Sequence, residues 1–150
     1  MSAYQNMFIR ADLIGLKDAK KAIEDALKKM GLYEKRHNKV KSFSLGMKQS
    51  LGIAAAILGE PKLLILDEPT NGLDPIAIAN VRKILEDVKA KGSTILISSH
   101  ILGEMEKMAT CYGFILNGKL VKEISEEEVK NNKIDLEKLF IEMAGGANNE

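Results

Sequence analysis

Apolar positions at helical spacing organise the start of the chain. Residues 19 to 30 carry apolar side chains every three or four positions, and residues 4 to 16 also have a helical pattern. Asp18 stands where it can cap the second of these helices, and Gly31 offers a natural stop. The basic, polar stretch 33–41 lacks apolar periodicity and predicts a solvated connector. Residues 1–42 are therefore expected to form a small helical unit.

A different pattern follows Ser44. Residues 47–58 are apolar on most faces, which predicts a buried helix, and Pro61 then breaks the chain. The run Leu63 to Leu66 is continuously apolar and predicts a parallel strand covered on both faces. Asp74 as N-cap and Pro75 at the first helical position predict a helix that ends at Gly92. With a second buried strand at 93–98, the order is strand, helix, strand, as in a parallel βαβ unit.

The last third of the sequence, from residue 101 on, has the patterns of a short helix, a β-hairpin and a final helix. A helix is expected from residue 101 to about residue 108. The apolar runs CYGFIL and KLVKEI are separated by Asn117-Gly118, the strongest short signal for a type I′ hairpin. Ser125 and Glu128 have the spacing of a capping box, and a final amphipathic helix is expected from about 135 to 143. The predicted division is 1–42 helical, 43–144 α/β, and 145–150 a flexible tail.

Composition narrows the function classes. The chain has 150 residues, enough for one domain with a core, and its 45% hydrophobic and 29% charged content is that of an ordinary globule. Twenty-two basic and twenty-one acidic residues leave a net charge of +1, which argues against binding nucleic acid or a membrane surface through charge. The one cysteine, Cys111, rules out an internal disulfide framework. No signal peptide or membrane span is indicated, so a cytosolic location is expected.

Two acids follow the first predicted strand directly. Groups at the carboxyl ends of parallel strands face the ligand crevice of an α/β sheet. There Asp67 can hold Mg²⁺, which prefers hard oxygen ligands, and Glu68 can orient an attacking water or accept its proton. The alternative is an ordinary acid pair that is solvated or caps a turn.

Two further positions have the chemistry to bind phosphate. His100 follows the second predicted strand and can donate a hydrogen bond to a phosphate oxygen, although it can equally be a residue that starts a helix. Ser44 begins a helix whose first N–H groups and dipole favour an anion, and Gly46 lets the backbone approach it. A plain capping serine is the alternative for Ser44.

Taken together, four segments resemble one family. FSLGMKQSLGIAAAIL, LLILDEP, NGLD and SSH are similar, in this order, to the signature loop, Walker B strand, D-loop and switch histidine of ATP-binding cassette (ABC) ATPases. LFIEMAGG and the signature form Ser44-Leu45-Gly46-Met47 resemble bacitracin- and lantibiotic-type exporters and immunity transporters. The resemblance covers essentially the whole chain. It implies an α/β fold: the C-terminal part of a P-loop NTPase domain, with parallel strands flanked by helices, an N-terminal helical subdomain and a C-terminal β-hairpin plus helix.

The resemblance also implies a division of roles among the site residues. Asp67 corresponds to the Mg²⁺ position, and Glu68 and His100 correspond to the catalytic positions. ATP held by a partner domain would be contacted by the signature and D-loop residues, namely Ser44, Leu45, Gly46, Met47 and Asp74. Leu45 and Met47 replace a glycine and a glutamine of the common signature, and Ser50 stands where many relatives carry arginine. Any contact of the signature with the γ-phosphate therefore depends on Ser44, Gly46 and backbone amides.

The phosphate-binding loop, G-x-x-x-x-G-K-S/T, does not occur in the sequence. Neither do the first strands or the Q-loop segment of the family, since Met1 aligns near the start of the helical subdomain. The expectation is a C-terminal part that alone neither binds ATP tightly nor hydrolyses it, but can present Ser44 to an intact partner. Open strand edges and an uncovered apolar face would favour association.

Implied partners are a second ABC ATPase domain, in a head-to-tail dimer, and an integral membrane permease that holds the subunit at the inner face of the cell membrane. No nucleic-acid partner is expected. One alternative is a chromosome-maintenance or DNA-repair ATPase, but the helices before Ser44 lack the sustained heptads of its coiled-coil arms. Another is a non-catalytic half-cassette that binds or regulates a full-length partner. The presence of Asp67, Glu68 and His100 argues mildly against it.

Overall fold

The computed structural model describes residues 1–146, which divide after Ser98 into two compact units. These units divide the chain at a different place from the sequence-based division at residues 42 and 144, which remains a prediction. Residues 147–150 of the predicted tail lie outside the described part of the chain. Each unit is described by itself.

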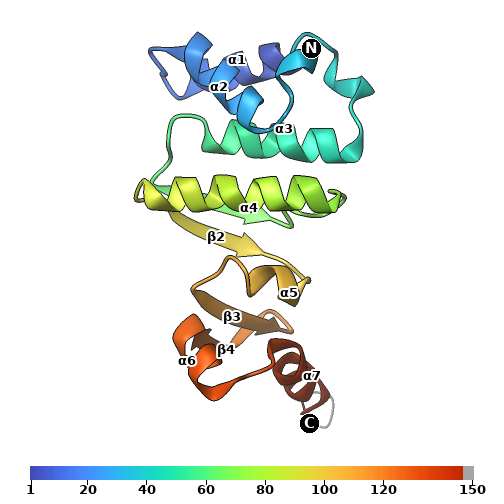
Figure 1. Ribbon diagram of the computed structural model, residues 1–150, viewed down its shortest axis with the longest axis vertical. Coiled ribbons are helices and arrows are strands. Elements are labelled where there is room, and N and C mark those ends of the chain that lie inside the picture. Colours follow the sequence, from blue (N-terminus) through green and yellow to red (C-terminus); the bar gives the residue numbers. More distant parts are fainter. Residues whose placement is uncertain (147–150) are drawn as a thin grey trace. The chain divides into compact units, whose positions relative to one another are not determined.

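Three helices form the first layer of the first unit: α1 (Ala3–Leu13), α2 (Ala19–Lys29) and α3 (Leu45–Ile57), as Figure 1 shows. The side chains of Met7, Ile23 and Leu27 are fully buried there, so the apolar periodicity correctly predicted the packed face. The predicted cap at Asp18 is wrong. Its side chain makes no capping hydrogen bond, because its backbone (ψ 48°) lies outside the extended region that an N-cap needs.

The polar connector after α2 is more ordered than predicted. It contains two 3₁₀ turns, η1 (Tyr33–Lys35) and η2 (Val40–Ser42). Its carbonyls accept hydrogen bonds from the start of α1, Ala3 N to Asn38 O at 3.1 Å and Tyr4 N to Arg36 O at 2.8 Å. The connector is largely exposed, but these bonds attach it to the helical layer. The periodicity of apolar side chains could not predict this order in the connector, because the bonds are made by backbone groups.

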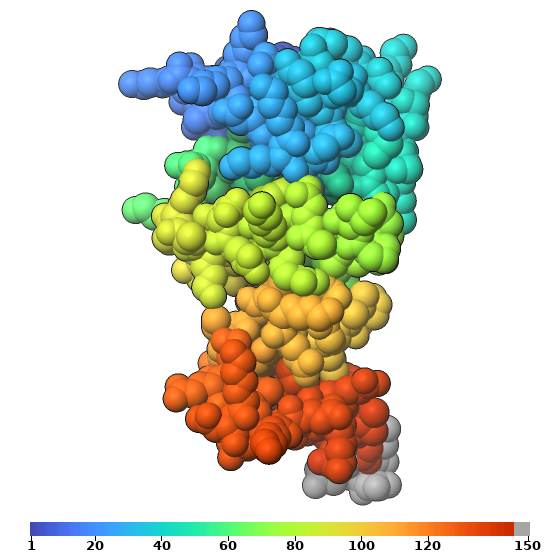
Figure 2. Space-filling view, viewed as in Figure 1, coloured from blue at the N-terminus to red at the C-terminus, as the bar shows by residue number. Residues whose placement is uncertain are grey.

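The predicted βαβ unit is confirmed. Strand β1 (Leu63–Asp67), helix α4 (Pro75–Ala90) and strand β2 (Thr94–Ser98) follow in order, and the strands pair in parallel with Asp67 opposite Ser98. The carboxylate of Asp74 caps α4, as predicted, by accepting a 2.8 Å hydrogen bond from the N–H of Ala77. In the space-filling view α4 lies across one face of this unit, next to the helical layer (Figure 2).

The prediction that the strand at residues 63–66 is covered on both faces is wrong, and so is the prediction that the second strand is buried. Leu64 and Leu66 are buried, whereas Leu63, Ile65 and Leu96 point to solvent. Within the described residues the sheet has two strands, and only the face with Leu64 and Leu66 is covered. An apolar run of this kind predicts two covered faces only where a full parallel sheet carries helices on both sides.

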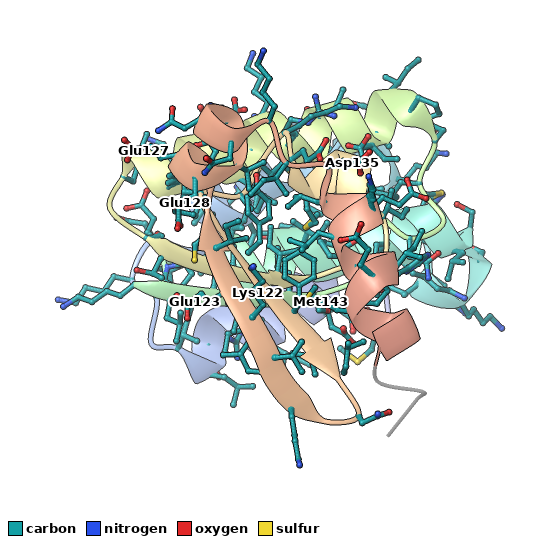
Figure 3. All side chains as sticks on the ribbon, turned by 90° about the horizontal axis from the view of Figure 1, so that it is seen from below. Lys122, Glu123, Glu127, Glu128, Asp135 and Met143 are labelled. Atoms are coloured by element: carbon teal, nitrogen blue, oxygen red, sulfur yellow. The ribbon has the colours of Figure 1, made fainter. Side chains whose placement is uncertain are left out.

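The second unit contains α5 (Leu102–Met105), β3 (Cys111–Leu116), β4 (Lys119–Ser125), α6 (Glu126–Asn132) and α7 (Leu136–Gly146). The hairpin β3–β4 turns at Asn117 and Gly118, both with positive φ, which confirms the predicted type I′ turn. The capping box at Ser125 is also confirmed. Figure 3 shows the hairpin with α6 and α7, on which Glu128 and Met143 are labelled.

Two helix lengths in this unit differ from the prediction. Helix α5 has four residues instead of about eight, because after Met105 the chain tightens into i→i−3 bonds such as Met108 N to Met105 O. A single short segment containing Gly103 is a poor helix by itself. Helix α7 instead continues through Gly145 and Gly146, the first two residues of the predicted tail.

Candidate functional site

The carboxyl end of β1 holds the two acids in a defined arrangement. The hydroxyl of Ser98, at the end of β2, donates a hydrogen bond to Oδ1 of Asp67. The N–H of Glu68 donates to the Ser98 carbonyl at 3.1 Å, so the parallel pairing extends past the end of β1. The sequence pattern missed Ser98. Ser98 could have been noticed because it ends the second of two parallel strands. The pairing of Ser98 with Asp67, however, is known only from the strand register in the structure.

Glu68 has an unusual backbone. Its φ of 46° lies in the left-handed region, which side chains other than glycine rarely adopt and which occurs often at functional sites. Its carbonyl accepts a 3.0 Å hydrogen bond from the side chain of Gln49 on α3 and a 3.1 Å bond from the N–H of Asn71. The next two residues, Pro69 and Thr70, are fully buried. Glu68 is therefore fixed at a turn that leads away from the strand direction.

The start of α3 packs against the loop before α4. A Cβ added at Gly46 would lie 3.2 Å from the carbonyl oxygen of Gly72, and one added at Gly72 would lie 2.8 Å from Cδ2 of Leu45. The sequence suggested that Gly46 lets the backbone approach an anion. The structure gives this glycine a packing role against the loop, and the anion role remains a prediction.

The other predicted nucleotide-binding side chains take local structural roles. Ser44 caps α3: its Oγ accepts a 3.2 Å hydrogen bond from the N–H of Met47. Leu45 is 67% exposed, and the sulfur of Met47 lies 3.9 Å from Nζ of Lys35. One carboxylate oxygen of Asp74, Oδ1, accepts the capping hydrogen bond from the N–H of Ala77 in α4. Leu45 and Gly46 lie beside Gly72 in the loop that leads to Asp74.

His100 is exposed and belongs to the second compact unit, two residues beyond the end of β2. Asp67 and Glu68 belong to the first unit. The expected position of His100 beside the acid pair is therefore still a prediction.

The donor set at the strand ends fits a magnesium ion that arrives with its own ligands. Asp67 and Ser98 present hard oxygens at the same edge, and Asp67 is exposed. Among residues 1–146 no group of three or more histidine, cysteine, aspartate or glutamate side chains can hold a metal. Since Mg²⁺ keeps several waters or phosphate oxygens, one carboxylate with a neighbouring hydroxyl is sufficient for a shared site.

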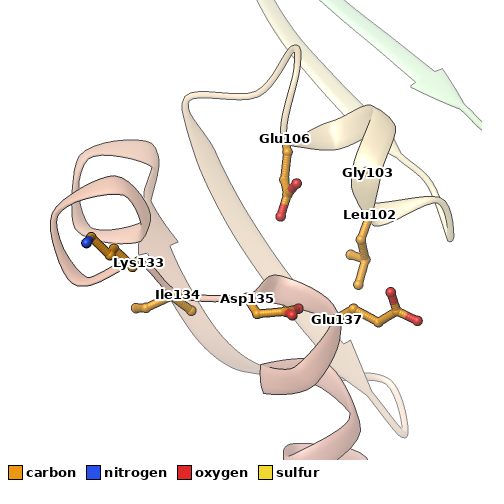
Figure 4. A pocket seen from close by; sticks show the side chains of 7 residues that line it. All are labelled: Leu102, Gly103, Glu106, Lys133, Ile134, Asp135 and Glu137. Carbon is orange, nitrogen blue, oxygen red and sulfur yellow. The ribbon is translucent and has the colours of Figure 1, made fainter.

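Two hollows are lined by residues other than the acid pair. One, of about 420 Å³ in the first unit, is lined by Met30, Ser50, Asp74, Ile76, Ala77 and Asn80. The other, of about 440 Å³ in the second unit (Figure 4), is lined by Leu102, Gly103, Glu106, Lys133, Ile134, Asp135 and Glu137. In the second hollow Asp135 already accepts a 3.0 Å hydrogen bond from the N–H of Lys138 at the start of α7. Neither hollow includes Asp67 or Glu68.

The part of the chain that the structure describes contains no helix with both the length and the apolar character needed to cross a membrane.

Comparison with known proteins agrees with the resemblance of the motifs. The family described as "ABC transporter" matches residues 1–71. The lantibiotic transport ATP-binding protein SrtF of Streptococcus pyogenes is 50% identical over 144 residues, which are 92% of this chain and 62% of that protein. The bacitracin transport ATP-binding protein BcrA of Bacillus licheniformis is 47% identical over 131 residues, 87% of this chain and 42% of that protein.

A solved structure described as an ATP-binding subunit of an ABC transporter superposes with a TM-score of 0.87 at 29% identity, over 96% of this chain and 62% of that one. The chain therefore spans about two fifths to three fifths of the length of these relatives. The predicted α/β fold of an ABC ATPase is confirmed. The chain matches the C-terminal part of the ATP-binding subunit of an ABC transporter of the lantibiotic and bacitracin type.

Proposed function

We propose that the chain is the C-terminal portion of an ATP-hydrolysing subunit that drives an ABC transporter for an antimicrobial peptide or drug, in export or immunity. The relatives that transport a lantibiotic and bacitracin support the transport class. One observation carries the chemistry: Asp67 and Glu68 are held together at the end of a parallel strand by Ser98. Phosphoryl transfer depends mainly on positioning and charge neutralisation, which such a fixed acid pair can contribute.

Each residue at the strand ends then has a task. Asp67 would hold the Mg²⁺ that arrives with ATP, and the ion would supply neutralisation of the phosphate charge. Glu68, fixed at its turn by the bonds to its carbonyl, orients the attacking water and accepts its proton. His100 donates a hydrogen bond to a phosphate oxygen.

The start of α3 acts on ATP that a second ABC ATPase domain holds in a head-to-tail dimer. The Oγ of Ser44 accepts from Met47, so its own proton can be donated to a phosphate oxygen. The N–H groups of Leu45 and Gly46 occupy the first two helical positions, which have no acceptor within any α-helix. Asp74 positions the loop next to them. A membrane permease is the second partner and places the subunit at the inner face of the cell membrane.

The sequence contains no phosphate loop among its 150 residues, and this favours one second candidate function. The chain would then be a non-catalytic half-cassette that binds or regulates a full-length ABC partner. In both cases the phosphate loop comes from residues other than these 150.

A chimera tests the catalytic proposal. The part of S. pyogenes SrtF ahead of the matched region is joined to this chain, and MgATP hydrolysis is measured. We expect turnover, and a fall on the order of 10²- to 10⁴-fold in Glu68→Gln with ATP binding retained, because the group that accepts the proton is lost. Glu60→Gln is the control, since Glu60 is an exposed acid whose partner is Lys91. It should leave the rate near that of the parent chimera.

Two results would count against the proposal. A folded chimera that binds MgATP without turning it over would favour the half-cassette. Turnover that is equal in the parent and in Glu68→Gln would remove Glu68 from the chemistry.

A further inference from the structure

The positive charge of the chain is concentrated in residues 28–48, the basic segment, which carry six lysines and one arginine against a single acid, Glu34. The lysines are Lys28, Lys29, Lys35, Lys39, Lys41 and Lys48, and the arginine is Arg36. Residues 1–27 carry four basic and four acidic side chains, and residues 49–150 carry eleven basic and sixteen acidic ones. The net charge of +1 for the whole chain is therefore the difference between +6 in the basic segment and −5 in residues 49–150.

The fold brings the parts of the basic segment together. Lys28, near the end of α2, and Arg36, after η1, both lie over the ring of Tyr33, with Nζ 4.8 Å and Cζ 4.0 Å from the ring centroid. Nζ of Lys35 lies 3.9 Å from the sulfur of Met47 in the first turn of α3. These contacts join the end of α2 and the start of α3 to the connector, which is itself bonded to the start of α1. The basic segment is drawn in light blue to turquoise in Figure 2.

The cations of the basic segment are open to solvent and are not neutralised by carboxylates. All six lysines are exposed, and Arg36 is half-buried. Within residues 1–146 none of the seven cations forms an ion pair, whereas cations elsewhere do, such as Lys91 with Glu60. Seven like charges that are close together repel one another, and contact with a polyanion relieves that repulsion. The basic segment therefore has the electrostatics of a surface that binds a polyanion.

The aromatic residues of the basic segment favour one class of polyanion over another. Proteins that bind single-stranded nucleic acid offer exposed aromatic rings on which the bases stack. Here Phe43 is only 5% exposed, and the ring of Tyr33 already has Lys28 and Arg36 over it. An anionic phospholipid bilayer needs no such ring, because its surface charge attracts a cluster of four to eight lysines and arginines directly. The basic segment therefore fits a bilayer better than a nucleic acid.

We propose that the basic segment binds the anionic phospholipid surface of a bilayer directly. The proposed function places the subunit at the inner face of the cell membrane through a permease, and the basic segment adds an attachment made by this chain itself. Each lysine or arginine close to such a surface strengthens binding about fivefold. The effect falls off within a Debye length, about 10 Å at 0.1 M salt, so the attachment is reversed by salt. It requires neither ATP nor the permease.

Flotation with lipid vesicles tests the inference on the 150-residue chain without nucleotide, because vesicles float in a density gradient and aggregated protein does not. Vesicles of phosphatidylcholine with about one third phosphatidylglycerol are compared with vesicles of phosphatidylcholine alone. We expect the chain to float with the anionic vesicles at low salt, to be released at high salt, and not to float with the neutral vesicles.

Paired charge reversals locate the contact. Lys39→Glu combined with Lys41→Glu should lower the partition coefficient onto anionic vesicles at least about twentyfold, because two cations of the basic segment are lost. Lys119→Glu combined with Lys122→Glu is the matched control, since it makes the same change of charge at two exposed lysines of β4. The control should change the partition coefficient less than about threefold. Circular dichroism verifies the fold, and Lys39→Gln with Lys41→Gln replaces the glutamate pair if that pair does not fold.

Four results would overturn the inference: no flotation with anionic vesicles, equal flotation with neutral vesicles, equal losses in the two paired variants, or binding of duplex DNA without flotation. The last result would assign the basic segment to nucleic acid. Inorganic phosphate is added as a further arm, and release of the chain from vesicles at constant ionic strength would assign the segment to free phosphate instead. Because the chimera is assayed without lipid, a failed flotation leaves the proposed function intact, and an inactive chimera leaves the lipid contact intact.

Discussion

The side chain of Leu45 lies against Gly72 at the candidate site. A Cβ at residue 72 would lie 2.8 Å from Cδ2 of Leu45, closer than real Cβ contacts allow, and the φ of +73° already disfavours any side chain there. The contact joins the start of α3 to the loop before α4. A side chain at residue 72 would therefore meet two separate obstacles, a disfavoured backbone conformation and a close approach to Leu45.

Gly72→Ala should destabilise the chain more than an alanine at another left-handed glycine. We expect the free energy of unfolding to fall by more than about 1 kcal/mol, measured by urea denaturation with circular dichroism. Gly15→Ala is the control, since Gly15 has a similar φ (+66°) and no atom within 4 Å of an added Cβ. The difference between the two variants isolates the Leu45 contact. Equal losses would show that Leu45 moves aside freely.

Single residues were predicted well where the chemistry is local. Asp74 caps its helix as expected, because the residue and the N–H it accepts from are three positions apart. Asp18 occupies the same kind of position but does not cap, because its backbone (ψ 48°) lies outside the extended region that an N-cap needs. The positive φ of Glu68 had no sequence signal, since no glycine or asparagine marks it.

Among the elements, α6 depends most clearly on its first turn. Ser125 Oγ accepts from the N–H of Glu128 at 3.2 Å. The Glu128 carboxylate accepts from the N–H and the hydroxyl of Ser125, at 2.9 and 2.7 Å. These hydrogen bonds, the backbone one first, lower the pKa of Glu128 from its ordinary value of 4.5. The bonds favour the charged form of the acid.

This box should make α6 sensitive to acid. Because the folded pKa of Glu128 is lowered, its stabilisation is complete above the ordinary value of 4.5 and disappears as the pH falls through the folded value. We expect Ser125→Ala to raise the pKa of Glu128 toward the ordinary value, as measured by NMR titration of the side-chain carboxyl. Glu127→Gln, one position away, should leave it nearly unchanged. A Glu128 pKa that is the same with and without the Ser125 hydroxyl would contradict the role of the box.

The elements themselves were largely readable from local patterns. The type I′ hairpin, α2, α4 and the strand–helix–strand order all follow from spacing and turn residues. Helix α5 was too short to predict reliably, because a few turns of periodicity do not separate a helix from successive i→i−3 turns. The order in the connector after α2 could not be predicted from the sequence, because its contacts are backbone hydrogen bonds to residues distant in the chain.

At the scale of the whole chain, we expect no tight binding of MgATP by these 150 residues alone. Asp67 and Ser98 can share a metal, but the backbone cradle and lysine of the phosphate loop do not occur in the sequence. Calorimetric titration with MgATP should therefore give no micromolar affinity. Micromolar binding that Asp67→Ala abolishes would contradict this expectation. Asp12→Ala, on the exposed side of α1, is the control.

The sequence by itself determined most of the elements, their order and the resemblance to ABC ATPases, because these depend on periodicity, turn chemistry and short motifs close together in the chain. Only the tertiary structure decided which apolar strand positions are covered. Leu64 and Ile65 are adjacent and equally apolar, yet one is buried and the other exposed, because burial depends on what packs on each face of the sheet. It also brought Ser98 to Asp67 and Gln49 to Glu68, across 31 and 19 residues of chain. Contacts at such separations are set by strand register and helix packing, which no local pattern contains.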